Sequence, residues 1–150
     1  MISLNLPAYP TKTTNDGGRT MIYDFLRRRY VALTPEEWVR QHFTHFLVDH
    51  KHYPAALLAN EVTLRLGTQA RRCDSVLYDR NGGRPRLIAE YKAPHVAITQ
   101  AVFNQISAYN LVLRVDYLIV SNGLTHYCCR MDYEARRPVF LRDIPDYAEL

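Results

Sequence analysis

Two stretches of alternating side chains flank the turn signal Asn81-Gly82-Gly83, and this arrangement constrains the fold more than any other feature of the sequence. A short glycine-containing loop between such stretches is typical of an antiparallel β-hairpin. Residues 72–78 and 86–92 are therefore predicted to pair. If the turn is centred on Gly82, the numbers of paired residues sum to twice 82, or 164. This register fixes which side chains share a face.

The register places two carboxylates directly opposite each other, because Asp74 pairs with Glu90. Side chains alternate along a strand, so Lys92 lies on the same face as Glu90. Two like charges about 5 Å apart cost on the order of 3 kcal/mol at an effective dielectric constant of 20, so the pair needs a cation. Mg²⁺ suits two carboxylates, a backbone carbonyl such as that of Tyr91, and a substrate phosphate. Such a metal site beside a lysine favours phosphodiester hydrolysis. The alternative is an exposed Glu90–Lys92 ion pair unrelated to Asp74.

The elements around the hairpin indicate a single α/β (α+β) domain over residues 1–150. Thr34-Pro35 is a strong helix start, and an apolar stripe extends the helix to about residue 49. A second helix is predicted at about 98–113. The expected strands are 21–25, 30–33, 60–66, 72–78, 86–92, 115–121 and 124–131, with Asn122-Gly123 as a tight turn. Residues 1–20 are predicted to form an arm, and residues 132–150 a surface wrap.

The first helix offers one further acid to the predicted site. With 100° per residue, Glu36 lies nearer to the apolar stripe than Glu37 does, so Glu36 is predicted to look toward the sheet. Glu37 is the second, less favoured candidate acid, because it is more simply explained as part of a capping box with Thr34. The alternative for Glu36 is an ion pair with Arg40 one turn later.

The second helix carries a polar residue that the prediction places within its apolar stripe. Gln105 needs a polar partner there, because a buried unpaired amide costs roughly 1–3 kcal/mol. Tyr109 lies one turn later on the same face. The two side chains are predicted to face the hairpin, where they contact either substrate or a structural hydrogen-bond partner.

Charge and composition narrow the class of protein. The chain has 150 residues and a net charge of +4, which mildly favours a polyanionic partner. Guanidinium groups suit phosphate oxygens, although most charge runs are solvated surface. The arginines considered for this role are Arg27, Arg28, Arg29, Arg71 and Arg72.

Other sequence features exclude several alternatives. No apolar run has the length of a membrane span, and the N-terminus lacks a secretory pattern, so a cytoplasmic protein without membrane contact is expected. The three cysteines are expected to be reduced. No phosphate-binding Gly-Lys loop occurs, so any ATP-driven motor must be a separate partner.

The pattern Asp74…Glu90-Tyr91-Lys92 within this order of elements resembles the PD-(D/E)xK nuclease superfamily. More narrowly, five segments resemble the N-terminal nuclease domain of type I restriction enzyme R subunits, and these are residues 34–41, 72–74, 90–94, 105–109 and 121–123. Cys73 replaces the proline of the superfamily pattern. The resemblance implies a restriction-endonuclease-like core in the order αβββαβ(β), with a mixed sheet flanked by helices.

The resemblance also implies an activity and roles for individual residues. It implies an Mg²⁺-dependent DNA endonuclease, with Mn²⁺ as a substitute, in which Asp74 and Glu90 hold the metal and Lys92 is catalytic. A helix glutamate reaches the metal site in such nucleases, and Glu36 beside Arg40 matches that pattern best. The resemblance implies a catalytic role for Gln105 and substrate contacts for Tyr109 and Asn122. Arg40 is also predicted to contact substrate.

Two functions are compatible with these residues. The first is a DNA endonuclease that works with restriction-modification or motor subunits, or as a homodimer that cuts both strands. The second is a catalytically silent module with the same fold that binds nucleic acid or assembles with other subunits. DNA and RNA substrates are not distinguished by the sequence.

Overall fold

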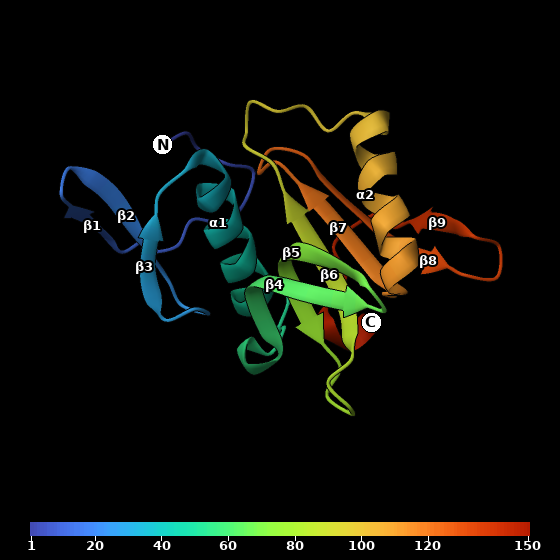
Figure 1. Ribbon diagram of the computed structural model, residues 1–150. Coiled ribbons are helices and arrows are strands. Elements are labelled where there is room, and N and C mark those ends of the chain that lie inside the picture. Colours follow the sequence, from blue (N-terminus) through green and yellow to red (C-terminus); the bar gives the residue numbers. More distant parts are fainter.

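The computed structural model covers residues 1–150 and describes them all except the side chains of Leu66 and Tyr109. Its centre is a six-stranded sheet in the order β4-β5-β6-β7-β8-β9 (Figure 1). The strands are β4 (Leu58–Leu66), β5 (Gln69–Tyr78), β6 (Pro85–Tyr91), β7 (Tyr117–Ser121), β8 (His126–Asp132) and β9 (Arg137–Phe140). Neighbouring strands are antiparallel except β6 and β7, which are parallel. A parallel pair needs a crossover, and helix α2 (Gln100–Leu113) supplies it. The predicted α/β class and mixed sheet are confirmed.

The predicted hairpin register is also confirmed. Ser75 pairs with Ala89 and Val76 with Ile88, so the paired numbers sum to 164. The register shifts only near the loop, between Leu77 and Tyr78.

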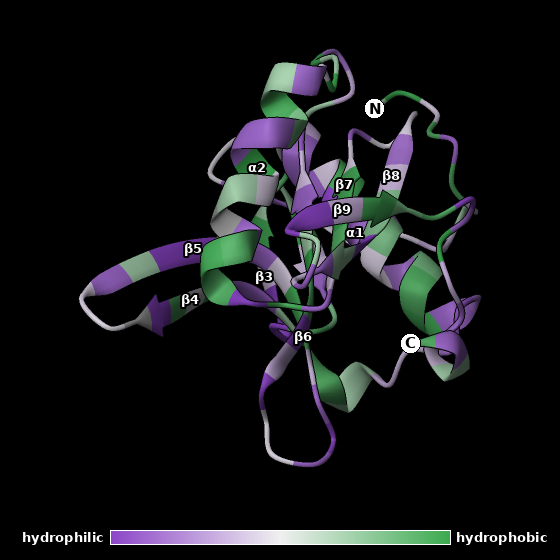
Figure 2. Ribbon diagram, turned by 90° about the vertical axis from the view of Figure 1, so that its right-hand side faces the viewer, coloured by the Kyte–Doolittle hydropathy of each residue, from purple (hydrophilic) through white to green (hydrophobic). Residues whose placement is uncertain are grey.

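The sheet separates two hydrophobic cores, and strand β6 contributes to both. Leu87, Ala89 and Tyr91 belong to the core beneath helix α1 (Pro35–Asp49), whereas Ile88 belongs to the core beneath α2. Alternation along a strand buried on both faces produces this division. Figure 2 shows the hydrophobic colouring in the middle of the sheet and a mostly hydrophilic β4–β5 hairpin projecting from it.

Adjacent cysteines follow the same alternation. Cys128 lies in the α1 core, while Cys129 lies in the α2 core. All three cysteines are buried and free, in agreement with the prediction.

A second, three-stranded antiparallel sheet precedes helix α1. It contains β1 (Thr13–Asp16), β2 (Arg19–Asp24) and β3 (Arg29–Ala32). The strands expected at 21–25 and 30–33 are present, but the expectation of an irregular arm over residues 1–20 was wrong for β1. Its backbone pairs with β2 through a tight Gly17-Gly18 turn, a hairpin signal that the sequence does contain.

Helix α1 lies between the two sheets (Figure 1). Thr34 caps it by accepting a hydrogen bond from the backbone of Glu37 at 3.0 Å. Val39, Phe43 and Leu47 pack on the large sheet. The side facing the small sheet is polar but also covered, so Gln41 and Thr44 are fully buried. Because two sides of this helix are covered, its apolar stripe alone does not predict which side chains are buried.

The C-terminal region contains more order than the predicted surface wrap. Residues of β9 pair with β8, and Ile144 is buried in the α1 core. The Tyr53 hydroxyl donates a hydrogen bond to the carbonyl of Pro145 at 3.0 Å. Among the described residues, no helix has the length and apolarity required to span a membrane.

Candidate active site

The end of the central hairpin brings two carboxyl groups together. Extending the β5–β6 register by one pair places Asp74 opposite Glu90, as predicted. The backbone N–H of Tyr91 donates a hydrogen bond to Oδ2 of Asp74 at 2.8 Å, which fixes the orientation of that carboxylate. The Asp74 and Glu90 carboxyl groups are close enough to share a hydrogen bond. Local strand pairing alone therefore assembles an acidic pair.

Burial changes the protonation of this pair. Glu90 is only 9% exposed, and burial followed by the charge of Asp74 raises its pKa well above the ordinary 4.5. Its Oε1 atom is buried without a hydrogen-bond partner and lies 3.7 Å from the guanidinium of Arg71. A buried carboxyl oxygen that accepts no hydrogen bond is suited to bind a cation.

Lys92 directly follows the last residue of β6, two positions after Glu90. Its backbone N–H donates to the carbonyl of Ser121 at 2.9 Å, so the chain is anchored to β7 at this point. The side chain is half-buried, and its charge acts to lower the Glu90 pKa. Among the described side chains, no carboxylate lies within ion-pair distance of Lys92. Lys92 therefore acts on Glu90 through its charge, without an ion pair of its own among the described residues.

The acid supplied by α1 is Glu37, and the prediction that Glu36 faces the sheet was wrong. Glu36 is exposed, whereas Glu37 is 7% exposed. The Glu37 carboxylate accepts hydrogen bonds from Arg27 at 2.8 Å and Gln41 at 2.9 Å. Because α1 is covered by both sheets, the centre of its apolar stripe does not mark the direction of the site. Glu37 faces a group of charged side chains between α1 and the two sheets, here called the charged layer. It contains Asp24, Arg27, Arg40 and Glu61.

Arg40 joins the α1 acid Glu37 to Asp74 and Glu61. Its guanidinium lies 3.5 Å from Glu37 and 3.7 Å from Asp74, and it forms an ion pair with Glu61. Arg40 was predicted to bind substrate, but the structure places it in this internal cluster at 6% exposure.

Glu61 on β4 is a site residue that the sequence analysis missed. It contacts both Arg40 and Arg72. The sequence contained a signal for this position. In residues 60–66, polar and apolar side chains alternate, Glu61 is one of the polar ones, and Gly67 marks a turn after them. Extending the hairpin logic to β4 and β5 would have placed it opposite Asp74.

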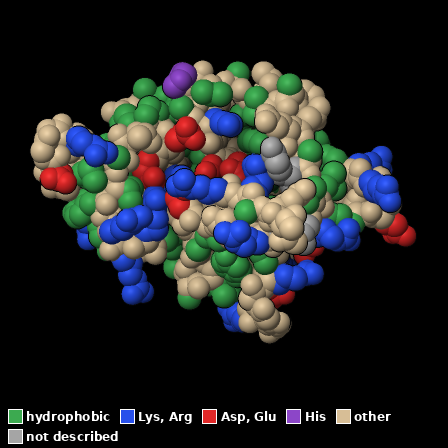
Figure 3. All heavy atoms as spheres, viewed as in Figure 1, with side chains coloured by type: hydrophobic (Ala, Val, Ile, Leu, Met, Phe, Trp, Pro, Cys, Tyr) green, Lys and Arg blue, Asp and Glu red, His purple; other side chains and the backbone are tan. Residues whose placement is uncertain are grey.

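The predicted phosphate-binding arginines separate into buried and exposed groups. Arg27 is 16% exposed and bonds to Asp24 and Glu37, so it is structural. Arg28 and Arg29 are exposed on the turn into β3. Arg72 is 74% exposed although it contacts Glu61, and Arg71 contacts Glu90. Figure 3 shows acidic side chains gathered between α1 and the large sheet, with Lys and Arg side chains around them.

Helix α2 does not direct Gln105 to the site. Gln105 is exposed, because the buried face of α2 carries Phe103, Ile106 and Asn110 instead. The prediction that Gln105 faces the hairpin was therefore wrong. The polar residues buried under α2 include Ser107 and Asn110, and the Asn110 amide donates to the Val115 carbonyl at 3.3 Å. The side chain of Tyr109 lies outside the described residues.

Asn122 has a structural position. It is 6% exposed, and its amide nitrogen donates to the Val96 carbonyl at 3.0 Å. Its side-chain oxygen accepts from the backbone N–H groups of Leu124 and Thr125. The loop is wider than the predicted two-residue turn, and the side chain is occupied in closing it.

The acidic pair fits a magnesium ion. Mg²⁺ is commonly held by one or two carboxylates and completes its octahedron with water and phosphate oxygens. Asp74 offers an oriented carboxylate, and Glu90 offers a buried oxygen that accepts no hydrogen bond. Among the described residues, no cluster of three or more His, Cys, Asp or Glu side chains could hold a metal alone. The donor set suits a hydrated Mg²⁺ better than a fully protein-bound ion.

The raised pKa of Glu90 makes the metal-free protein sensitive to pH. The folded state holds this proton more tightly than the unfolded state, so its stabilising contribution is present below about pH 4.5 and is lost as pH rises toward the folded pKa. We expect Glu90→Gln to raise the metal-free melting temperature more at pH 8 than at pH 5. A gain of about 1 kcal/mol corresponds to roughly 2–4 °C.

Calorimetry in EDTA at both pH values measures this effect. Glu134→Gln is a matched control, because Glu134 is an exposed acid between β8 and β9. An equal gain at the two pH values would contradict a buried, protonated Glu90.

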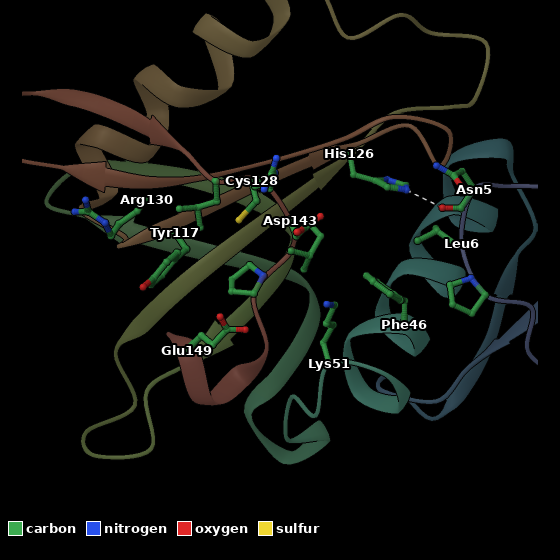
Figure 4. A pocket seen from close by; sticks show the side chains of 15 residues that line it. Asn5, Leu6, Phe46, Lys51, Tyr117, His126, Cys128, Arg130, Asp143 and Glu149 are labelled. Atoms are coloured by element: carbon green, nitrogen blue, oxygen red, sulfur yellow. Dashed lines mark hydrogen bonds between the residues drawn. The ribbon is translucent and has the colours of Figure 1, made fainter.

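A large cavity lies elsewhere, between α1, the β7–β8 strands and the C-terminal segment (Figure 4). Its volume is about 730 Å³, and Lys51, His126 and Asp143 are among its lining residues. His126 bonds to the carbonyl of Asn5 at 2.8 Å, which ties the N-terminal segment to its rim. None of the predicted site residues lines this cavity, so it is separate from the acidic pair.

Comparisons with known proteins agree with the fold. A solved structure described as a fragment of an HsdR subunit of a type I restriction enzyme from Vibrio vulnificus YJ016 superposes with a TM-score of 0.54 at 18% sequence identity. The match covers 79% of this chain and 24% of that chain. The comparison with curated proteins gives no match. Residues 35–145 match the family described as "Type I restriction enzyme R protein N terminus". That match covers most of the chain, which therefore belongs to the family of type I restriction enzyme R protein N-termini.

Proposed function

We propose that this chain is a nuclease domain that hydrolyses DNA phosphodiester bonds with Mg²⁺. The observation that carries the proposal is the Asp74–Glu90 pair beside an unpaired Lys92. Family membership supports a role in restriction. The PD-(D/E)xK pattern of these three residues supports hydrolysis as the reaction.

Each residue of the proposed site has a separate task. Asp74, Glu90 and the backbone carbonyl of Tyr91 would hold the metal, which when bound polarises the phosphate and lowers the pKa of water. Tyr91 also orients Asp74 through its N–H. Glu90 must release its proton to bind a cation, because its raised pKa keeps it protonated in the metal-free protein.

Lys92 acts on the substrate in this proposal. Its ammonium group would contact a phosphate oxygen and stabilise the negative charge that develops during hydrolysis. Glu37 contributes indirectly, since its contacts hold Arg27 and Arg40 in the charged layer behind Asp74.

The partners that we propose are inferred from family membership and not from the geometry of the site. The chain spans about a quarter of the HsdR fragment that it resembles. We propose that it works with motor and modification subunits of a restriction system, and that paired copies cut the two strands of a duplex.

A cleavage assay tests the proposed function. The purified chain is incubated with plasmid, single-stranded DNA and RNA in Mg²⁺, Mn²⁺ or EDTA. We expect metal-dependent nicking or linearisation of DNA. Metal-independent DNA binding without cleavage, alone and with its restriction partners, would instead favour a silent binding module.

Exposed arginines are expected to contact the phosphate backbone. Arg28→Ala and Arg29→Ala should each flatten the slope of log affinity against log salt by about 0.9, because each lost phosphate contact releases one counterion fewer. Fluorescence anisotropy over a salt series measures this slope. Arg142→Ala removes an exposed cation of the C-terminal segment and should leave the slope unchanged. Wild-type slopes in all three variants would indicate that Arg28 and Arg29 are solvated surface residues that do not contact phosphate.

A further inference from the structure

Arg40 is a buried cation shared by three carboxylates. Glu37, Glu61 and Asp74 surround it, and Glu61 makes the closest contact. Burial opposes the charge of Arg40, but the three acids more than offset burial and raise its pKa. This permanent cation therefore lies directly beside a carboxylate that the proposed function assigns to a metal ion.

The backbone of Glu61 has an unusual conformation. Asn60 pairs with Ser75 and Val62 pairs with Cys73, which leaves Glu61 opposite Asp74 without a regular strand pair. Its φ angle is 58°, in the left-handed region that side chains of this size rarely adopt. Such a conformation is energetically costly within a strand and clusters at functional sites in proteins. The irregular position lies next to the acidic pair.

The contacts of Arg40 are unequal, and the difference affects Asp74. Arg40 forms its close ion pair with Glu61, whereas its distance to Oδ1 of Asp74 is 3.7 Å. The same guanidinium also donates to the backbone carbonyl of Asp74 at 3.4 Å. Asp74 is 22% exposed at its side chain and retains an oxygen that is not in a close ion pair.

We propose that Glu61 is a positioning residue that holds Arg40 back from the Asp74 carboxylate and so keeps Asp74 available to a divalent cation. This inference rests on the proposed function. Without Glu61, Arg40 loses its closest partner, and Asp74 is the nearest remaining acid on the sheet. A direct Arg40–Asp74 pair would then compete with the cation for the same oxygens.

The test compares two substitutions that differ in charge. Glu61→Gln removes the charge, whereas Glu61→Asp keeps it but shortens the side chain by one methylene group. Mn²⁺ affinity is measured by electron paramagnetic resonance of the free ion at fixed pH. We expect both variants to bind Mn²⁺ about tenfold more weakly, as is typical when a partner of a metal ligand is removed. Glu134→Gln should retain wild-type affinity.

Melting temperatures of the metal-free variants separate positioning from general stability. A purely structural Glu61 would lower the melting temperature and leave the Mn²⁺ affinity of the folded protein unchanged, which would overturn the proposal. Wild-type affinity in Glu61→Asp alone would also overturn it, because charge rather than position would then matter. If the wild-type protein itself bound no Mn²⁺, the proposed function would fail together with this inference.

Discussion

Glu90→Gln and Lys92→Ala should each reduce DNA cleavage by about a thousandfold in saturating Mg²⁺, a loss typical of removing one electrostatic group from an active site. Glu90→Gln loses a charged oxygen that the metal would use, and its side chain has nearly the same volume. Lys92→Ala removes the amine that would stabilise charge on the phosphate. Single-turnover cleavage of supercoiled plasmid measures both rates.

The dependence on metal concentration should distinguish the two variants. Glu90→Gln should need more Mg²⁺ to reach half-maximal rate, because it has lost a metal ligand. Lys92→Ala should need about the wild-type concentration. Glu36→Gln serves as the comparison within the same site region, because Glu36 is exposed and should retain activity. Full activity in Glu90→Gln would show that the acidic pair is structural.

Asp24→Ala should destabilise the protein by about 3–5 kcal/mol, the usual cost of removing one partner from a buried ion pair. Asp24 is fully buried and accepts hydrogen bonds from the Leu26 backbone at 2.8 Å and from the Asn60 amide at 3.0 Å. It also forms an ion pair with Arg27. The substitution removes this acceptor from the Leu26 N–H and the Asn60 amide, while Arg27 keeps only Glu37.

The effect should depend on pH in a defined direction. Burial acts to raise the Asp24 pKa, but hydrogen bonds from Asn60 and Arg27 more than offset it, and the pKa is lowered from 3.8. The stabilising contribution is therefore present above about pH 4 and is lost as pH falls through the lowered value. The difference between wild type and Asp24→Ala should shrink in strong acid.

Urea denaturation at several pH values measures the free energy of unfolding. Asp16→Ala is the control, since Asp16 is an exposed acid at the end of β1 and should change stability by less than about 0.5 kcal/mol. A similarly small change in Asp24→Ala would mean that the small sheet does not depend on this carboxylate.

This buried carboxylate also links the small sheet to the strands of the site. Asn60 accepts a hydrogen bond from Ser75 at 2.6 Å, and Ser75 accepts one from the hydroxyl of Tyr91 at 2.9 Å. Ser75 and Tyr91 adjoin the two site acids in sequence. The small sheet lies outside the residues that match the family. Even so, Asp24 of this sheet begins a chain of hydrogen bonds that reaches β4, β5 and β6.

Local pattern was sufficient to predict the centre of the site. The Gly82-Gly83 loop and the alternation around it determine the register of β5 and β6, and the register alone places Asp74 opposite Glu90. The start of α1 at Thr34-Pro35 was predictable for the same reason, because a helix cap depends on a few adjacent residues. These features needed no knowledge of distant contacts.

Helix orientation needed the tertiary structure. An apolar stripe identifies the buried side of a helix that is covered once, but α1 is covered on two sides, so Glu37 rather than Glu36 faces the charged layer. In α2, the predicted apolar stripe included Gln105, but the buried side of the helix does not, and Gln105 is exposed.

The sequence by itself determined the paired acids, the hairpin that carries them and the lysine that follows, because these depend on alternation and on one tight turn. The tertiary structure alone decided that Glu37 and Glu61 join Arg40 behind that pair. Glu61 reaches Arg40 from a left-handed backbone position within a strand, a conformation that local propensity disfavours and that packing between two sheets and a helix maintains.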